Sequence, residues 1–212
     1  GKLADLMIID LERPNMQPIN NITKNLVYSG SKDDVKMTMI NGKILYENGE
    51  FVRNPKEDLV KVAVVERHQG TGNVACGFLK GYGIKEGAVA LSVAHDSHNI
   101  IVVGVNDEEM EFAVNSLIAQ EGGIVLVKEG KVIEQMPMPI AGLMSDQSGE
   151  WVDEKLTSIH EKAYTELGIC GDVEPVMTLC FMSLAVIPEI KLTDMGLFDV
   201  TTFSFIPVEI SR

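Results

Sequence analysis

The sequence has 212 residues, 45% of them hydrophobic, and a formal net charge of −13 at pH 7. A chain of this length can bury one good core, or one core with a smaller lobe beside it. The negative charge argues against nucleic acid and anionic membrane surfaces as partners, because both would repel it. No apolar run reaches the length of a membrane span.

The ends and the cysteines indicate a cytoplasmic protein. No basic stretch followed by a long apolar one opens the sequence, so there is no sign of a signal peptide. Cys76, Cys170 and Cys180 have no Cys-x-x-Cys spacing, which favours buried, reduced thiols over a disulfide or a zinc site. Gly1 leads almost at once into an apolar strand, so we expect the sequence to begin within a domain.

The first block predicts a small β-meander. Strands are predicted at residues 6–10, 35–40, 43–46 and 50–52. The run at 6–10 is continuously apolar, which indicates a buried strand, and two Asn-Gly pairs (41–42 and 48–49) give strong hairpin signals. Residues 54–58 are polar and contain a proline, so we place a linker there and divide the chain into domains at 1–53 and 54–212.

The second block mixes strands with helices. Strands are predicted at residues 59–66, 124–127 and 131–134. Asn106 precedes an acidic first turn, which predicts a helix that ends at Gly122-Gly123, and a second amphipathic helix is predicted over 151–167. The tail over 176–207 indicates packed loop and short strands. The fold class is therefore α+β or layered α/β, with no eightfold barrel, since that fold needs roughly 200 residues or more.

Residues 92–100 concentrate polar chemistry between apolar segments. They read Ser-Val-Ala-His-Asp-Ser-His-Asn-Ile and hold two of the four histidines. Burying such groups is costly unless they bond one another, a metal or a ligand. His95 and His98 would point to opposite faces of a strand, but the residues around them favour a turn that brings both rings together. A ligand- or metal-facing role and a self-satisfied polar network both stay open, and no third metal ligand is evident.

Glu66, Arg67 and His68 end a predicted strand, which is a frequent place for a site in a layered α/β fold. Taken alone, they fit an ordinary exposed charge cluster equally well. Residues 69–73 contain a Gly-x-Gly, but without a third phased glycine this is a weak nucleotide-loop signal. His160 lies among charged residues of the second helix and is predicted to be solvated.

Several short sequence segments together resemble those of one protein family. They are Asn48–Val52, Ala63–His68, Thr71–Asn73, Val93–Ile100, Val103–Gly104, Asn106–Asp107, Pro139–Asp146 and Ile187–Asp194. From Asn48 onwards the chain resembles the C-terminal region of bacterial adenine deaminases, members of the amidohydrolase superfamily. Gly1–Leu6 and Ile40–Lys43 resemble the segment by which amidohydrolases leave their barrel and complete a small β-domain. Leu11–Pro14 and Asn25–Ser29 look more like the thiomethyladenosine deaminase and chlorohydrolase branch, which leaves open whether the two blocks belong to one gene.

The resemblance implies hydrolysis of adenine to hypoxanthine and ammonia by a complete enzyme that binds a divalent metal such as manganese, iron or zinc. The His-x-His of the first barrel strand is absent here, so we expect the chain alone to be inactive and to bind no metal. Its expected partners are the catalytic barrel of the same protein and further copies in a homo-oligomer.

We predict that the chain presents a polar cluster close to the substrate. The candidate residues are His95, Asp96, His98 and Asn99, with Glu66, Arg67 and His68 as a second group. The alternatives are a stand-alone purine- or metal-binding module and a purely structural or oligomerisation domain.

Overall fold

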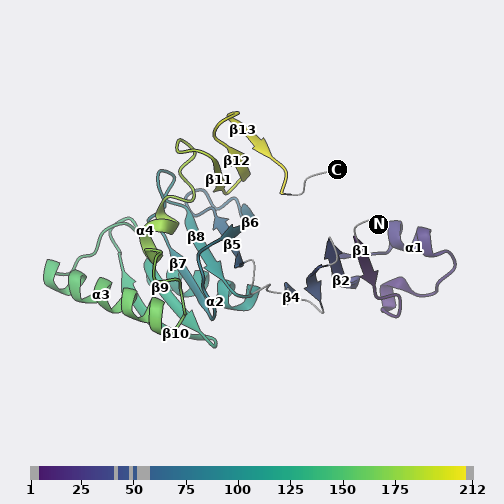
Figure 1. The fold of residues 1–212 in the computed structure, drawn as a ribbon, viewed down its shortest axis with the longest axis horizontal. Coiled ribbons are helices and arrows are strands. Elements are labelled where there is room, and N and C mark those ends of the chain that lie inside the picture. Colours follow the sequence, from purple (N-terminus) through teal and green to yellow (C-terminus); the bar gives the residue numbers. More distant parts are fainter. Residues whose placement is uncertain (1–4, 41–42, 48–49, 52–57, 209–212) are drawn as a thin grey trace. The chain divides into compact units, whose positions relative to one another are not determined.

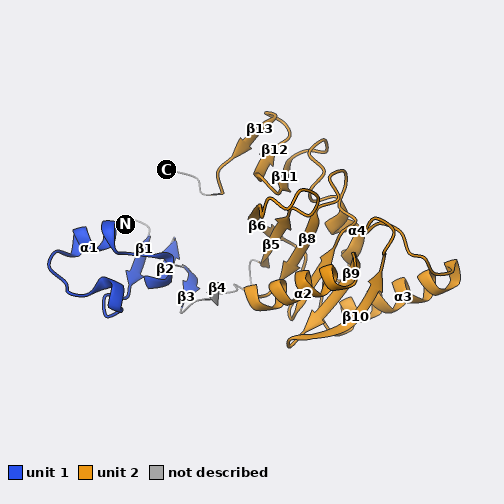
Figure 2. Cartoon of the chain, turned by 180° about the vertical axis from the view of Figure 1, so that it is seen from behind, with its two compact units in different colours: residues 1–54 blue, residues 55–212 orange. Residues whose placement is uncertain are grey.

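The computed structural model describes residues 5–40, 43–47, 50–51 and 58–208, which form two compact units, Gly1–Asn54 and Pro55–Arg212 (Figure 2). Both predicted Asn-Gly turns and most of the predicted linker lie outside the described residues. Each unit is described by itself below. The assignment of the first block to the small β-domain of an amidohydrolase stays a prediction.

The first unit is built on an antiparallel sheet in the order β1-β2-β3-β4. Its strands are β1 (Leu6–Ile9), β2 (Val35–Ile40), β3 (Lys43–Glu47) and β4 (Glu50–Phe51). Between β1 and β2 lie two short 3₁₀ helices, η1 (Pro14–Met16) and η2 (Lys32–Asp34), and the helix α1 (Ile22–Tyr28). The Asn21 side chain caps α1 by accepting the Lys24 N–H at 3.0 Å.

The prediction that β1 is buried is wrong. Leu6, Met7 and Ile8 are 43%, 56% and 47% exposed. The physical reason is position: β1 is an edge strand that pairs only with β2 within its sheet, and an apolar run does not reveal whether another layer covers it.

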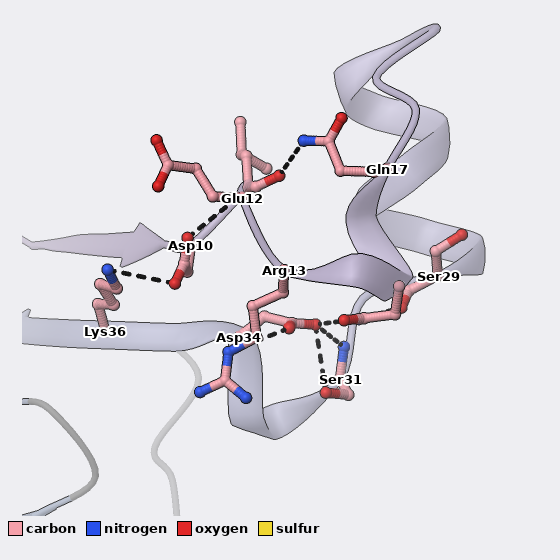
Figure 3. A network of polar contacts seen from close by, with 10 residues as sticks. Asp10, Glu12, Arg13, Gln17, Ser29, Ser31, Asp34 and Lys36 are labelled. Carbon is pink, nitrogen blue, oxygen red and sulfur yellow. Dashed lines mark hydrogen bonds and ion pairs between the residues drawn. The ribbon is translucent and has the colours of Figure 1, made fainter.

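A buried carboxylate ties the β1–β2 connection together (Figure 3). Asp34 is 1% exposed and accepts hydrogen bonds from the Ser31 N–H at 2.7 Å and from Asn15 Nδ2 at 2.8 Å. The Ser31 N–H is the main cause that lowers the pKa of Asp34. On the strand side, Lys36 pairs with Asp10 at 3.2 Å. The charged form of Asp34 thus holds the irregular segment against the start of β2.

The second unit is built on a six-stranded sheet in the order β10-β9-β7-β8-β5-β6 (Figure 1). Its strands are β5 (Leu59–Val65), β6 (Val74–Lys80), β7 (Ala88–Leu91), β8 (Ile100–Gly104), β9 (Gly123–Lys128) and β10 (Lys131–Pro137). Every neighbouring pair is antiparallel. The predicted strand over 59–66 and the hairpin at Glu129-Gly130 are both present.

Helices cover both faces of this sheet, as expected for a layered α/β fold, and the described residues form no closed barrel. One face carries small residues such as Ala63, Ala88 and Ala90 and packs against α2 (Asp107–Ala119). The other carries larger residues and packs against α3 (Gly149–Thr165) and α4 (Pro175–Cys180). Successive side chains of a strand point to opposite faces, so each central strand supplies the small residues of one face and the larger residues of the other.

The helix ends follow local sequence chemistry. The Asn106 side chain accepts the Glu109 N–H at 2.8 Å, and the acidic first turn of α2 suits the positive end of the helix dipole. Ser148 caps α3 at the Trp151 N–H, so that helix begins before the predicted start at Trp151.

The tail forms α4 and an antiparallel meander of β11 (Ile190–Thr193), β12 (Gly196–Asp199) and β13 (Ser204–Ile206). The meander packs on β6 at Gly77, where an added Cβ would lie 3.4 Å from Leu197 Cδ2. No helix of the described ranges is long and apolar enough to span a bilayer. The three cysteines are free, but only Cys180 is buried, so the prediction of buried thiols is wrong for Cys76 and Cys170, which are exposed.

Candidate functional site

The six-stranded sheet gathers several loops at one of its ends. The pairs Val65↔Ile100 and Leu91↔Ile124 align the end of β5 with the start of β8 and the end of β7 with the start of β9. The pair Pro137↔Gly123 adds the end of β10. The β5–β6 turn (66–73), the β7–β8 loop (92–99) and the segment after β10 (138–146) therefore lie at the same end. We call this the sheet-end cluster.

The β7–β8 loop turns, as the sequence predicted. The His98 N–H donates to the Ala94 carbonyl at 2.6 Å, and His98 has a positive φ of 52°. The His95 N–H donates to the Cys180 carbonyl at 2.8 Å, which fastens the loop to the end of α4. The two imidazole rings meet edge to face with their centroids 5.5 Å apart, and His95 also packs on Phe181 at 5.0 Å.

His98 has a partly buried ring with an open nitrogen. Its Nδ1 atom is inaccessible to solvent and has no hydrogen-bond partner among the described residues. Desolvation is the main cause that lowers the pKa of His98, and the neighbouring His95 and Arg67 lower it further while Asp96 raises it. His98 is therefore neutral at neutral pH, and its Nδ1 can either accept or donate one hydrogen bond.

We predict that the pKa of the His98 imidazole lies below its ordinary value of 6.5. Replacing Asp96 by Asn should lower this pKa further, because it removes the charge that favours the imidazolium. Arg67→Met should raise it, because it removes a repelling positive charge. Titration of the imidazole nitrogens by NMR measures the His98 pKa in the wild type and in both variants. A wild-type pKa at or above 6.5 would contradict the structure.

Arg67 joins the β7–β8 loop to the segment after β10. Its Nε donates to the His98 carbonyl at 2.5 Å and its Nη2 to the Ala141 carbonyl at 2.9 Å. The guanidinium lies against Gly142, where an added Cβ would be 2.8 Å from Nη1. The side chain of Asn99, which is 4% exposed, accepts the Arg67 N–H at 3.4 Å.

Ser92 makes a second link between these loops. The residue is fully buried, its hydroxyl donates to the Gly142 carbonyl at 2.5 Å, and it accepts the Gly123 N–H at 2.8 Å. The sequence placed Ser92 in the polar segment but gave it no role, since its partners lie far along the chain.

Glu66 stabilises the β5–β6 turn, in which it lies. Its carboxylate accepts the N–H groups of Thr71 at 3.0 Å and Gln69 at 2.7 Å, the Thr71 hydroxyl at 3.0 Å, and the His68 N–H. The Thr71 N–H is the main cause that lowers the pKa of Glu66 to about 2. The Gly-x-Gly is explained by positive φ angles of 62° at Gly70 and 75° at Gly72 in this turn.

The structure brings most of the predicted residues together. Arg67, His98 and Asn99 are in contact, His95 packs on His98, and His68 Nε2 lies 2.7 Å from the Ser97 carbonyl. The Asp96 side chain is exposed to solvent. The residues to which the sequence gave no role are Ser92, Ala141, Gly142 and Phe181. No group of three potential metal-binding side chains occurs in the part of the chain that the structure describes.

His160 is not merely solvated, as the sequence had predicted. Its Nε2 pairs with the Glu174 carboxylate, and its Nδ1 lies 2.7 Å from the Leu156 carbonyl. This contact joins α3 to the cap of α4, where Glu174 also accepts the Met177 N–H. It lies outside the sheet-end cluster, so we assign it to the packing of these helices.

The fold and the loop cluster define a layered α/β domain built on an antiparallel sheet, with several loops gathered at one end of that sheet. The family profile described as "Adenine deaminase C-terminal domain" matches residues 36–204, and the chain belongs to this family. The match begins at β2, inside the first unit, and ends in β13.

Curated relatives agree with this family. "Adenine deaminase 2" of Desulfotalea psychrophila is 61% identical over 98% of this chain and 35% of its own length. "Adenine deaminase" of Ligilactobacillus salivarius is 52% identical over 77% of this chain and 28% of its own length. The chain thus spans about a third of the length of such relatives. Because the first of them matches almost the whole chain, both sequence blocks occur together in one known protein.

Proposed function

We propose that this chain is the C-terminal part of an adenine deaminase that hydrolyses adenine to hypoxanthine and ammonia. Family membership and the printed names of the relatives support this proposal. The chain covers only about a third of those relatives, so the rest of the polypeptide would supply the catalytic barrel. A divalent metal, when bound in that barrel, would lower the pKa of the attacking water.

The contribution of this chain would be to present the sheet-end cluster at the mouth of the barrel. The observation that carries this proposal is the buried Nδ1 of His98, which has no hydrogen-bond partner among the described residues and lies beside His95 and Arg67. Unpartnered buried polar atoms are uncommon in folded proteins and call for an explanation. A rotation of the His98 side chain would expose this nitrogen, and the neutral imidazole could then hydrogen-bond a substrate nitrogen or a group of the barrel without gaining charge.

The cluster also has a rigid frame, which is what a site needs to orient another group. Arg67 bonds the β7–β8 loop and the segment after β10, Ser92 links the same loop and segment by a second bond, and Glu66 closes the turn that carries Arg67. Asp96 and His68 stand exposed beside this frame, where they can contact substrate or the barrel. We place His95, Asp96, His98 and Asn99 first and the 66–68 group second as substrate-proximal residues.

The first unit and the oligomer belong to the same proposal. The exposed apolar side chains of Leu6, Met7 and Ile8 would be covered in the complete enzyme, if this unit completes the small β-domain beside the barrel. We propose in addition that the enzyme is a cytoplasmic homo-oligomer, since the composition favours a cytoplasmic protein and the domain is a candidate for contacts between copies.

Substitution in the complete enzyme tests the role of the cluster. We expect His98→Ala to lower the turnover of adenine at least about tenfold, as a lost positioned polar group does, and His95→Ala to lower it less. Lys131→Met is the control, because Lys131 is exposed at the opposite end of β10. Turnover, thermal stability and bound metal are measured for each protein. Normal turnover of folded His95→Ala and His98→Ala enzymes would contradict the role.

The same unpartnered nitrogen favours a second candidate, a purine- or metal-binding module that acts without chemistry. Calorimetry of the 212-residue chain with adenine and with Zn²⁺ or Mn²⁺ tests this possibility. Binding that is lost in His98→Ala would support it, and no heat with either ligand would remove it.

A further inference from the structure

We propose that Arg67 is a positioning residue for the deaminase, because it couples His98 to the segment 138–146 and makes that segment a second wall of the substrate-facing surface. This inference rests on the proposed function and deepens it. Neither Arg67 as a coupling residue nor the 138–146 segment as part of the site follows from the sequence alone.

The coupling depends on the shape of a guanidinium. Two different nitrogens of Arg67 serve two carbonyls, Nε that of His98 at 2.5 Å and Nη2 that of Ala141 at 2.9 Å. A planar, charged group with several fixed donors can bond two acceptors at once. A lysine carries its three donors on one nitrogen, so it cannot reproduce donors that are set on two separate nitrogens of a planar group.

The flat face of the Arg67 guanidinium explains why residue 142 is a glycine. Gly142 has a positive φ of 74°, and a Cβ there would lie 2.8 Å from Nη1 and 3.1 Å from Cζ of Arg67. Only a residue without a side chain lets the guanidinium lie against the backbone of the 138–146 segment. The contact is therefore specific to the pair Arg67 and Gly142.

The 138–146 segment is held firmly and presents apolar groups. The Ile140 and Met144 backbones exchange hydrogen bonds, each at 3.2 Å, and Ala141 also has a positive φ of 59°. The side chains of Ile140 and Met144 are 46% and 58% exposed. Exposed apolar side chains thus flank Ala141, whose carbonyl Arg67 ties to the His98 backbone. Apolar lining with a few placed polar groups is the composition of sites that bind small organic molecules.

Arg67 is not the only contact that holds the 138–146 segment, since the Ser92 hydroxyl donates independently to the Gly142 carbonyl at 2.5 Å. Loss of Arg67 should loosen the segment without releasing it, and should free the carbonyl of His98 at the same time. The imidazole of His98 and residues 140–144 would then no longer be fixed relative to each other.

Hydrogen exchange of the complete deaminase tests the coupling without reference to activity. In Arg67→Lys and in Gly142→Ala we expect amides of both 92–99 and 138–146 to exchange at least about tenfold faster, as when local stability falls by about 1.4 kcal/mol. Amides of α2 should keep their wild-type rates. Lys131→Met is the control that alters a lysine at the other end of the sheet.

Kinetics of the same variants test the positioning role. We expect kcat to fall on the order of 10-fold to 100-fold in Arg67→Lys, with bound metal unchanged and a smaller change in KM. Unchanged exchange in 138–146 would overturn the coupling, whatever the activity. Faster exchange with normal kcat in both Arg67→Lys and His98→Ala would instead overturn the proposed function, and the positioning role with it.

Discussion

Gly87→Ala is expected to destabilise the second unit by about 3 kcal/mol or more, as forced overpacking does. Gly87 has a positive φ of 67°, and an added Cβ would lie 1.9 Å from the Val127 carbonyl oxygen and 2.9 Å from Leu167 Cδ2. The first of these atoms is backbone of β9, which pairs with β7 in the middle of the sheet, so it cannot move aside cheaply.

Gly130→Ala is the matched control for this change. Gly130 has nearly the same φ, 66°, but an added Cβ would meet nothing within 4 Å. The control should therefore show only the backbone strain of an L-residue, about 1–2 kcal/mol. Denaturation followed by the fluorescence of Trp151, the only tryptophan and part of the second unit, measures both. Equal losses in the two variants would contradict the packing described at Gly87.

Glu134→Ala is expected to cost about 2–3 kcal/mol, since it breaks a largely buried ionic cluster and strands its cations. The Glu134 side chain is 10% exposed and lies 2.8 Å from Lys155 Nζ and 3.2 Å from Lys162 Nζ. It also accepts the Ser158 hydroxyl at 2.5 Å. These contacts fasten α3 to β10 on one face of the sheet.

The cluster has a pH signature as well. Burial opposes ionisation of Glu134, but hydrogen bonds from Lys155, Ser158 and Lys162 outweigh it and hold the pKa at about 2, below the ordinary 4.5. A lowered pKa means that this stability is present above pH 4.5 and is lost as the pH falls towards 2.

Glu154→Ala, which removes an exposed acid from α3, is the control for Glu134→Ala and should change stability by less than about 0.5 kcal/mol. Chemical denaturation at pH 7 and again near pH 3 measures both variants. If Glu134→Ala were as stable as Glu154→Ala at pH 7, the cluster would not hold α3 in place.

Local signals in the sequence predicted much of the second unit. The cap at Asn106 and the turn at Glu129-Gly130 are short-range features whose chemistry is complete within a few residues, so pattern alone finds them. The burial of β1 and the partner of His160 depend on what other segments cover or contact, and both predictions were wrong.

The candidate site was predicted in part for the same reason. The residues between His95 and Asn99 are close in sequence, and a turn was the only way for both imidazoles to meet. The strand order places β8 between β7 and β5, and so brings Arg67 to His98 and to Ala141. No local pattern gives that order, which is why the bond between Ser92 and Gly142 was missed.

Ammonia release from adenine by the complete enzyme, compared between wild type, His98→Ala and Lys131→Met, tests the central claim most directly. The proposed role of the sheet-end cluster predicts that His98→Ala loses at least about tenfold in kcat, while its bound metal and thermal stability stay within error. Lys131→Met should match wild type. A folded, metal-loaded His98→Ala enzyme with wild-type kcat and KM would contradict the claim that this region serves the active site.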